Sequence, residues 1–240
     1  MDHALELGTA MSRFAELAAM SAGDEPVPAC EGWTVHDLTV HLGTIHRWAG
    51  SILLSGQRLP EPKPLVTEPV SEWYSGTASA LLGAVQAVSP DEPVPNFSHL
   101  GETAAFWSRR QMHETTVHAV DAAQALGFDE GRWTVDPALA ADGIDEVLQV
   151  FFPRMTARGR RPDVRSRIRL VATDVGQTWI VGPGTEGGTP LQLHPSREAD
   201  TTVTGTASDL YLGLWHRVSR HRLEFDGDDA VAMFEGPTTP

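Results

Sequence analysis

The hydrophobic pattern of this 240-residue chain changes its period once, near the charged segment at residues 158–162. Before this segment, apolar residues recur every three or four positions between Pro- and Gly-rich breaks, which predicts amphipathic helices. After it, apolar and polar residues alternate from Val164 to Ala172, and this alternation predicts a half-exposed strand. We therefore expect an α+β protein, with a helical domain over residues 1–155 and a smaller α+β domain over residues 163–240.

Local signals mark where several of these elements begin and end. Asp37 follows Thr34 by three residues, as in a capping box, so a helix is expected to begin after Thr34. Thr206 with Asp209 predicts a second such start, and Gly127 is expected to end a long helix in a left-handed cap. The expected helices lie at residues 7–18, 34–52, 73–88, 102–126 and 136–153, and the further short strands at 177–182, 190–194 and 200–205.

Composition and missing motifs exclude several classes of protein. The chain has 18 Lys and Arg against 32 Asp and Glu, and a net charge of −14 argues against nucleic acid or an anionic membrane as partner. Its single cysteine, Cys30, excludes an internal disulfide and is expected to be structural or incidental. No long apolar run or signal sequence is present, so we expect a cytoplasmic protein. The sequence contains no P-loop, GxSxG or HExxH motif.

Two helical segments carry side chains suited to a metal ion. His41 interrupts an otherwise apolar stripe, so its imidazole is expected to point into the helical domain. Glu114 and His118 are four residues apart and share one side of the long helix, with Arg110 and Asp121 on the same line. If the two helices pack together, two His and one Glu converge and leave a coordination position open, as in catalytic zinc or non-haem iron sites.

Simpler interpretations of the same residues remain open at this point. His41 alone suits a core histidine bonded to a backbone carbonyl, and Glu114 with His118 suits a hydrogen-bonded pair on a solvated helix face. The other histidines are poorer ligand candidates. His36 and His46 lie about 140° around the helix from His41, and His113 lies about 100° from Glu114.

Three segments of the chain resemble the maleylpyruvate isomerase family of mycothiol-dependent enzymes. Two are CEGWTVHDLTVHLGTIHRW at residues 30–48 and WSRRQMHETTVHAVDAA at residues 107–123. The third is ADTTVTGTASDLYLGLWHR at residues 199–217. The resemblance extends over nearly the whole chain. It implies a DinB-like four-helix bundle followed by a smaller α+β domain similar to sterol-carrier folds.

The resemblance also implies roles for individual residues. The family's metal-binding histidine, carboxylate and second histidine fall on His41, Glu114 and His118, and zinc is the expected divalent ion, with iron or nickel as alternatives. The family's catalytic arginine falls on Arg217. Because the family pattern has glycine where this chain has His216, a different local backbone is expected there.

The implied activity is that of a mycothiol-dependent isomerase or S-transferase. The metal would activate the thiol of mycothiol for attack on a small electrophilic substrate, whose carboxylates Arg110 or Arg217 would bind. The expected protein is a monomer or homodimer without nucleic-acid or membrane partners. Two alternatives are a metal-dependent hydrolase that needs no thiol, and a non-catalytic module whose C-terminal domain holds an apolar ligand.

Overall fold

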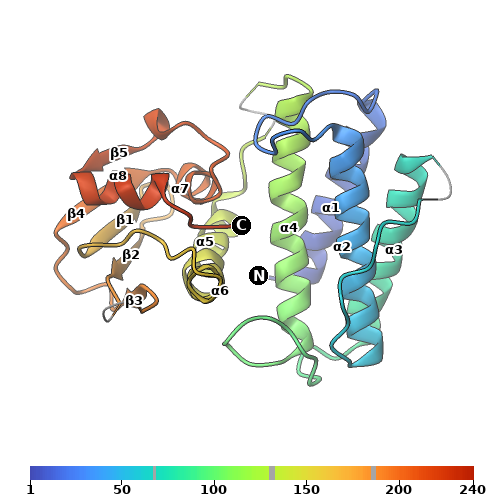
Figure 1. Ribbon diagram of the computed structural model, residues 1–240, viewed down its shortest axis with the longest axis horizontal. Helices are drawn as coiled ribbons and strands as arrows, with labels where there is room; N and C mark the ends of the chain where they lie inside the picture. Colours follow the sequence, from blue (N-terminus) through green and yellow to red (C-terminus); the bar gives the residue numbers. More distant parts are fainter. Residues whose placement is uncertain (67–68, 130–132, 185–187) are drawn as a thin grey trace. The chain divides into compact units, whose positions relative to one another are not determined.

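The computed structural model describes residues 1–66, 69–129, 133–184 and 188–240 (Figure 1). The chain divides into two compact units: Met1–Phe97 with Gly101–Thr134, and Ser98–Leu100 with Val135–Pro240. The first unit is helical and the second contains a five-stranded sheet, so the predicted mixed α+β class is confirmed. Within the described residues, no helix is both long and apolar enough to cross a membrane.

The first unit is built from helices α1 (His3–Met20), α2 (Val35–Ser55), α3 (Val70–Ala87) and α4 (Ala104–Ala125). Helix α1 packs mainly against α4 and α3, whereas α2 packs mainly against α3 and α4. Their apolar stripes meet in an interior that includes Phe14, Leu42, Leu81 and Val120. The packing places α2 beside α4, and these are the two helices that carry the predicted metal ligands.

The second unit combines short helices with a mixed sheet. Its helical segments are α5 (Pro137–Glu146), the π-helical turn Val147–Phe151, α6 (Phe152–Ala157), α7 (Ala207–Leu214), the 3-10 turn Arg220–Arg222 and α8 (Asp228–Glu235). Its strands are β1 (Ile168–Ala172), β2 (Gln177–Gly182), β3 (Leu191–Leu193), β4 (Thr201–Gly205) and β5 (Glu224–Asp226). Helices α7 and α8 contact the sheet, and α5 packs against α7.

The strand order is β3-β2-β1-β4-β5, with β1 and β4 parallel and all other neighbours antiparallel. Leu170 of β1 is in register with Val203 of β4, and both side chains are completely buried. The predicted alternation from Val164 is present in side-chain burial, since Val164 is buried and Arg165 is exposed. Strand pairing nevertheless begins only at Ile168.

The caps recognised in the sequence are confirmed. Thr34 and Asp37 form a capping box at the start of α2, in which each side chain accepts the backbone N–H of the other residue. Thr206 accepts the N–H of Asp209 at the start of α7. Gly127 follows α4 with φ +71°, in the left-handed conformation that glycine favours. These caps define the limits of the helices and hence which side chains face a neighbouring helix.

The boundary between the two units differs from the expected domain boundary. The sequence pattern predicts a helical domain that extends to residue 155, whereas residues 135–157 lie in the second unit, where α5 packs against α7. A helical pattern shows that a segment buries one face, but it does not say which body that face covers. The structural division therefore begins the second unit at Val135.

Candidate metal centre

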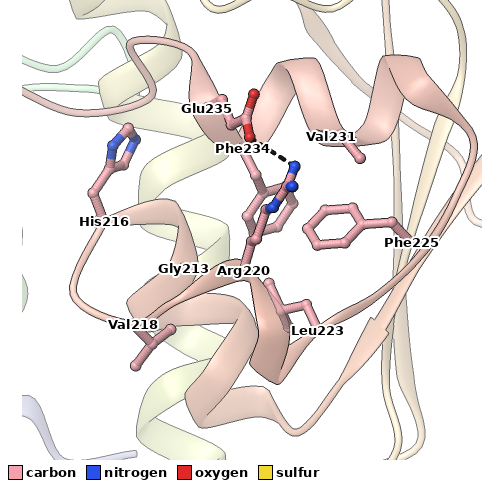
Figure 2. A pocket seen from close by; sticks show the side chains of 9 residues that line it. All are labelled: Gly213, His216, Val218, Arg220, Leu223, Phe225, Val231, Phe234 and Glu235. Carbon is pink, nitrogen blue, oxygen red and sulfur yellow. Dashed lines mark hydrogen bonds and ion pairs between the residues drawn. The ribbon is translucent and has the colours of Figure 1, made fainter.

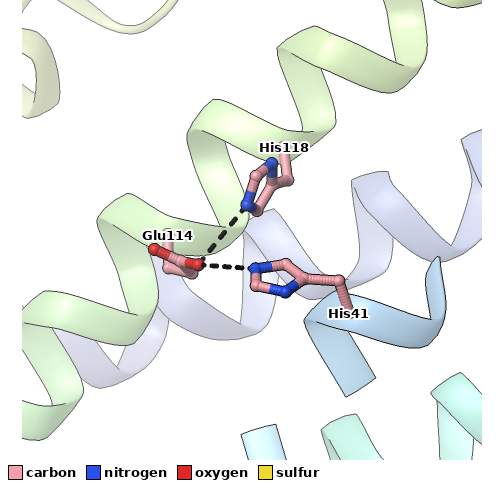
Figure 3. A group of neighbouring side chains, drawn as sticks. All are labelled: His41, Glu114 and His118. Carbon is pink, nitrogen blue, oxygen red and sulfur yellow. Dashed lines mark hydrogen bonds and ion pairs between the residues drawn. The ribbon is translucent and has the colours of Figure 1, made fainter. Parts of the chain in front are cut away.

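His41 on α2 faces Glu114 and His118 on α4 (Figure 3). Nε2 of His41 and Nε2 of His118 each lie 3.4 Å from Oε1 of Glu114. One ligand atom from each of the three residues lies within 4.8 Å of the other two. The structure thus brings together the three side chains that helical spacing and the family resemblance had selected.

The geometry and chemistry of these side chains fit a shared metal ion. Two ligand atoms about 2.1 Å from a tetrahedral zinc ion lie roughly 3.4 Å apart, whereas N–H···O hydrogen bonds cluster near 2.9 Å. Two imidazole nitrogens and one carboxylate oxygen are a donor set that zinc and non-haem iron accept. The side chains of His41, Glu114 and His118 are 28%, 18% and 11% exposed, so the site is sheltered but reachable from solvent.

Arg110 orients Glu114 from one turn earlier on α4. Its Nη2 donates to Oε2 of Glu114 at 2.7 Å, and the Arg110 side chain is only 3% exposed. Burial raises the pKa of Glu114, but the charge of Arg110 and hydrogen bonds from His118 and His41 hold that pKa well below its usual range. The carboxylate is therefore ionised, with Oε2 held by Arg110 and Oε1 directed at the two imidazoles.

Asp121 orients His118 in a similar way. Oδ2 of Asp121 lies 2.9 Å from Nδ1 of His118, and the carboxylate is completely buried. Burial lowers the pKa of His118, but hydrogen bonds to Asp121 and Glu114 raise it to about 9. With Nδ1–H donated to Asp121, Nε2 is the nitrogen available to a metal, which would displace the proton there.

Cys30 lies next to the carboxylate of Asp121 and is not one of the three candidate metal ligands. Its Sγ is 3.9 Å from Oδ2 of Asp121. The turn that contains Cys30 leads to Trp33, whose ring centroid is 5.0 Å from that of His41. Cys30 thus contacts the carboxylate that orients His118.

His46 is buried in the interior and has a different partner. Its Nε2 lies 3.0 Å from Oγ1 of Thr115, whose hydroxyl donates to the carbonyl of Gln111. Because the single hydroxyl proton is used there, Nε2–H of His46 must be the donor to Thr115. Burial lowers the pKa of His46 to about 3, so the ring is neutral. The sequence-based exclusion of His46 from the ligand set agrees with this arrangement.

Arg217 lies just after α7 in the second unit. Its Nη1 donates to the carbonyl of Trp215 at 2.6 Å, and the residue is half-buried. His216, which precedes Arg217, has φ +60°, in the left-handed region that glycine favours. The expected difference from the family's backbone at this position stays a prediction. Nε2 of His216 lies 3.0 Å from Oγ1 of Thr238, a contact that helps to hold this conformation.

A cavity of about 460 Å³ adjoins His41, and sequence reasoning did not anticipate it. Trp33 and a proline-rich loop that includes Glu61 contribute to its walls. Trp33 lies within the motif at residues 30–48, from which only His41 is predicted as a site residue. The loop shows no hydrophobic period, so nothing in the sequence indicated that it folds back on α2.

The second unit contains a separate cavity of about 360 Å³ (Figure 2). Its walls are largely apolar and include Leu223, Phe225 and Phe234. Arg220 and Glu235 form an ion pair at 3.0 Å beside it. This is the cavity in which the non-catalytic alternative would place an apolar ligand.

Comparison with protein families matches both parts of the chain. Residues 4–123 match the mycothiol maleylpyruvate isomerase N-terminal domain, and residues 138–233 match the MDMPI C-terminal domain. The first match contains the three candidate ligands, and the second contains Arg217. Among curated proteins, no match was found.

Two solved structures resemble the chain over most of its length. One is a mutant of the mycothiol-dependent maleylpyruvate isomerase, with 14% sequence identity, a TM-score of 0.62, and coverage of 93% of this chain and 91% of the other. The second is the mycothiol-dependent maleylpyruvate isomerase, with 14% identity, a TM-score of 0.54, and coverage of 88% and 86%. At this level of identity the likeness establishes a shared fold.

Proposed function

Because the chain belongs to the mycothiol maleylpyruvate isomerase family, a family of enzymes, we propose that it is a mycothiol-dependent isomerase or S-transferase with a divalent metal in its active site. The ligands are His41, Glu114 and His118. The observation that carries this proposal is the pair of 3.4 Å separations between Oε1 of Glu114 and the two imidazole nitrogens.

The metal, when bound, lowers the pKa of a coordinating thiol so that a thiolate is available near neutral pH. Mycothiol would supply that thiol for addition to an activated double bond in isomerisation, or for displacement of a leaving group in S-transfer. The chain orients the ligands for this chemistry. Arg110 holds one oxygen of Glu114, so the carboxylate offers a single oxygen, and Asp121 directs Nε2 of His118. Three protein ligands leave at least one coordination position open.

Arg110 and Arg217 are the two candidates for pairing with substrate carboxylates, and each belongs to a different unit. Arg110 is almost completely buried and already donates to Glu114. Arg217 is half-buried and carries a guanidinium suited to bidentate pairing with a carboxylate.

Turnover of maleylpyruvate and of a panel of electrophiles, with and without mycothiol, tests the proposal. We expect activity that requires mycothiol, disappears after chelation and returns with zinc. His41→Ala should reduce kcat at least about 100-fold, because one of three ligands is lost. The matched control is His36→Ala, which removes an exposed histidine from the same helix and should leave kcat unchanged.

Two other outcomes would replace the proposal. Turnover that needs the metal but not mycothiol would establish the hydrolase alternative. A protein that binds no metal after reconstitution with zinc, iron or nickel, and that carries an apolar ligand, would establish the binding module.

A further inference from the structure

The cavity beside His41 has a wall chemistry that selects one class of ligand. Its lining includes Trp33, Asp37, Val40, His41, Glu61 and Pro62. His41 is the only proposed metal ligand among the residues that line it. A molecule in this cavity therefore lies directly beside the metal centre.

The loop wall of the cavity is attached to α2 by two side chains. Nε1 of Trp48 donates to the carbonyl of Leu59 at 2.8 Å, and Nη1 of Arg47 donates to the carbonyl of Leu65 at 3.4 Å. These bonds hold both ends of the segment that carries Glu61. The cavity wall is thus part of the folded unit.

The charge of the wall is negative. Asp37 and Glu61 line it, and no Lys or Arg does so among the described residues. Hydrogen bonds from the backbone N–H and the hydroxyl of Thr34 lower the pKa of Asp37, so this group is ionised at neutral pH. Both bonds use Oδ2, which leaves Oδ1 available to a ligand. A dicarboxylate would be repelled here.

The remaining wall of the cavity beside His41 is largely apolar and partly flat. The indole of Trp33 packs near His41, and Val40 and Pro62 add aliphatic surface. Flat apolar faces combined with carboxylate acceptors complement a ring that carries C–H groups on its faces and hydroxyl groups on its edge. Hydroxyl donors to ionised carboxylates form short, strong hydrogen bonds.

We infer that this cavity binds a neutral, polyhydroxylated ring, and that it receives the sugar portion of the thiol co-substrate while the carboxylate substrate binds elsewhere. The inference rests on the proposed function, since mycothiol is a thiol built on a glucosamine–inositol scaffold. Occupation of this cavity would place the thiol end beside His41.

Calorimetric titration with N-acetylglucosaminyl-inositol, which lacks a thiol, tests the inference independently of catalysis. We expect saturable binding to wild type and to His118→Ala. Affinity should fall about tenfold in Glu61→Gln and at least as much in Trp33→Leu, since a lost charge-assisted hydrogen bond or stacking face is worth about 1.4 kcal/mol or more. Glu16→Gln, which removes an exposed carboxylate on α1, is the matched control and should bind like wild type.

Kinetics separate this inference from the proposed function. In Glu61→Gln, KM for mycothiol should rise about tenfold while kcat and KM for the electrophile stay near wild type. Binding of N-acetylglucosaminyl-inositol without any mycothiol-dependent turnover would overturn the proposed function, but the inference about the cavity would stand. Mycothiol-dependent turnover with an unchanged mycothiol KM in both Glu61→Gln and Trp33→Leu would overturn the inference and keep the function. If Trp33→Leu does not fold, Glu61→Gln on the exposed loop decides alone.

Discussion

The two units differ in how many polar and charged side chains they bury. In the first unit, one helix, α4, buries charged and polar side chains that include Arg110, Gln111, His113, His118 and Asp121. In the second unit, the central strands bury aliphatic and aromatic side chains, and among the described residues the buried polar and charged side chains, which include Glu146 and Asp209, are fewer. The ion pairs Arg167–Asp200 and Arg220–Glu235 of this unit are exposed. Buried charges destabilise a fold unless each has its partner. The polar interior of the first unit is therefore expected to be the part most sensitive to single substitutions.

The largest expected effect comes from breaking the Arg110–Glu114 pair. Glu114→Ala leaves the buried Arg110 guanidinium without this carboxylate, so the free energy of unfolding should fall by about 3–5 kcal/mol. Urea denaturation at pH 7 in the presence of a chelator measures this loss without any contribution from metal. Glu114→Gln keeps an amide oxygen for Arg110 and should lose less. A loss below about 1 kcal/mol in Glu114→Ala would show that the pair does not stabilise the unit.

The pH dependence of the unfolding free energy tests whether His46 is buried in its neutral form. Burial lowers its pKa to about 3 in the folded chain from 6.5 when unfolded, so only the unfolded chain takes up this proton as the pH falls below 6.5. The stabilisation is complete above pH 6.5 and is lost as the pH falls toward 3. Between pH 7.5 and pH 5, wild type should lose about 2 kcal/mol more unfolding free energy than His46→Gln. Equal losses would contradict the assignment of a neutral, buried His46.

His216 provides a smaller test in the second unit. Both His216→Gly and His216→Ala remove the contact with Thr238, so their difference isolates the backbone at φ +60°. Glycine adopts this conformation without the steric penalty of a Cβ, and His216→Gly should be more stable than His216→Ala by about 1 kcal/mol. Thermal unfolding of the two variants measures the difference, and an equal or higher stability of the alanine variant would refute a left-handed residue 216.

The smallest effect is expected for the exposed Arg220–Glu235 ion pair of the second unit. The side chains of Arg220 and Glu235 are 55% and 59% exposed, so Glu235→Gln should change the unfolding free energy by less than about 0.5 kcal/mol. Urea denaturation under the conditions used for Glu114→Ala gives a direct comparison. A loss of unfolding free energy above 1 kcal/mol would contradict the expected difference between the buried and the exposed ion pair.

The site was predictable from sequence to the extent that it depends on local structure. The capping box at Thr34 sets the start of α2, and a spacing of four residues places Glu114 and His118 on one side of α4. His41 stood out because it interrupts an apolar stripe. These signals act within single helices, and the family motifs selected the same residues.

Features that depend on contacts between distant segments were not predictable in the same way. Helix α5 packs with the sheet unit although its pattern is that of any amphipathic helix. The cavity beside His41 exists because side chains of α2 hold a loop whose sequence has no hydrophobic period. The left-handed backbone at His216 was also missed, because histidine rarely adopts it and a contact with Thr238 helps to hold it here.

The central claim is that His41, Glu114 and His118 together hold one divalent ion. The most direct measurement is elemental analysis of untagged protein that has been loaded with zinc and dialysed, beside a His41→Ala/His118→Ala variant. The account predicts about one zinc per wild-type chain and essentially none in the variant. A wild-type protein that loses its zinc on dialysis, or a variant that retains as much as wild type, would contradict it.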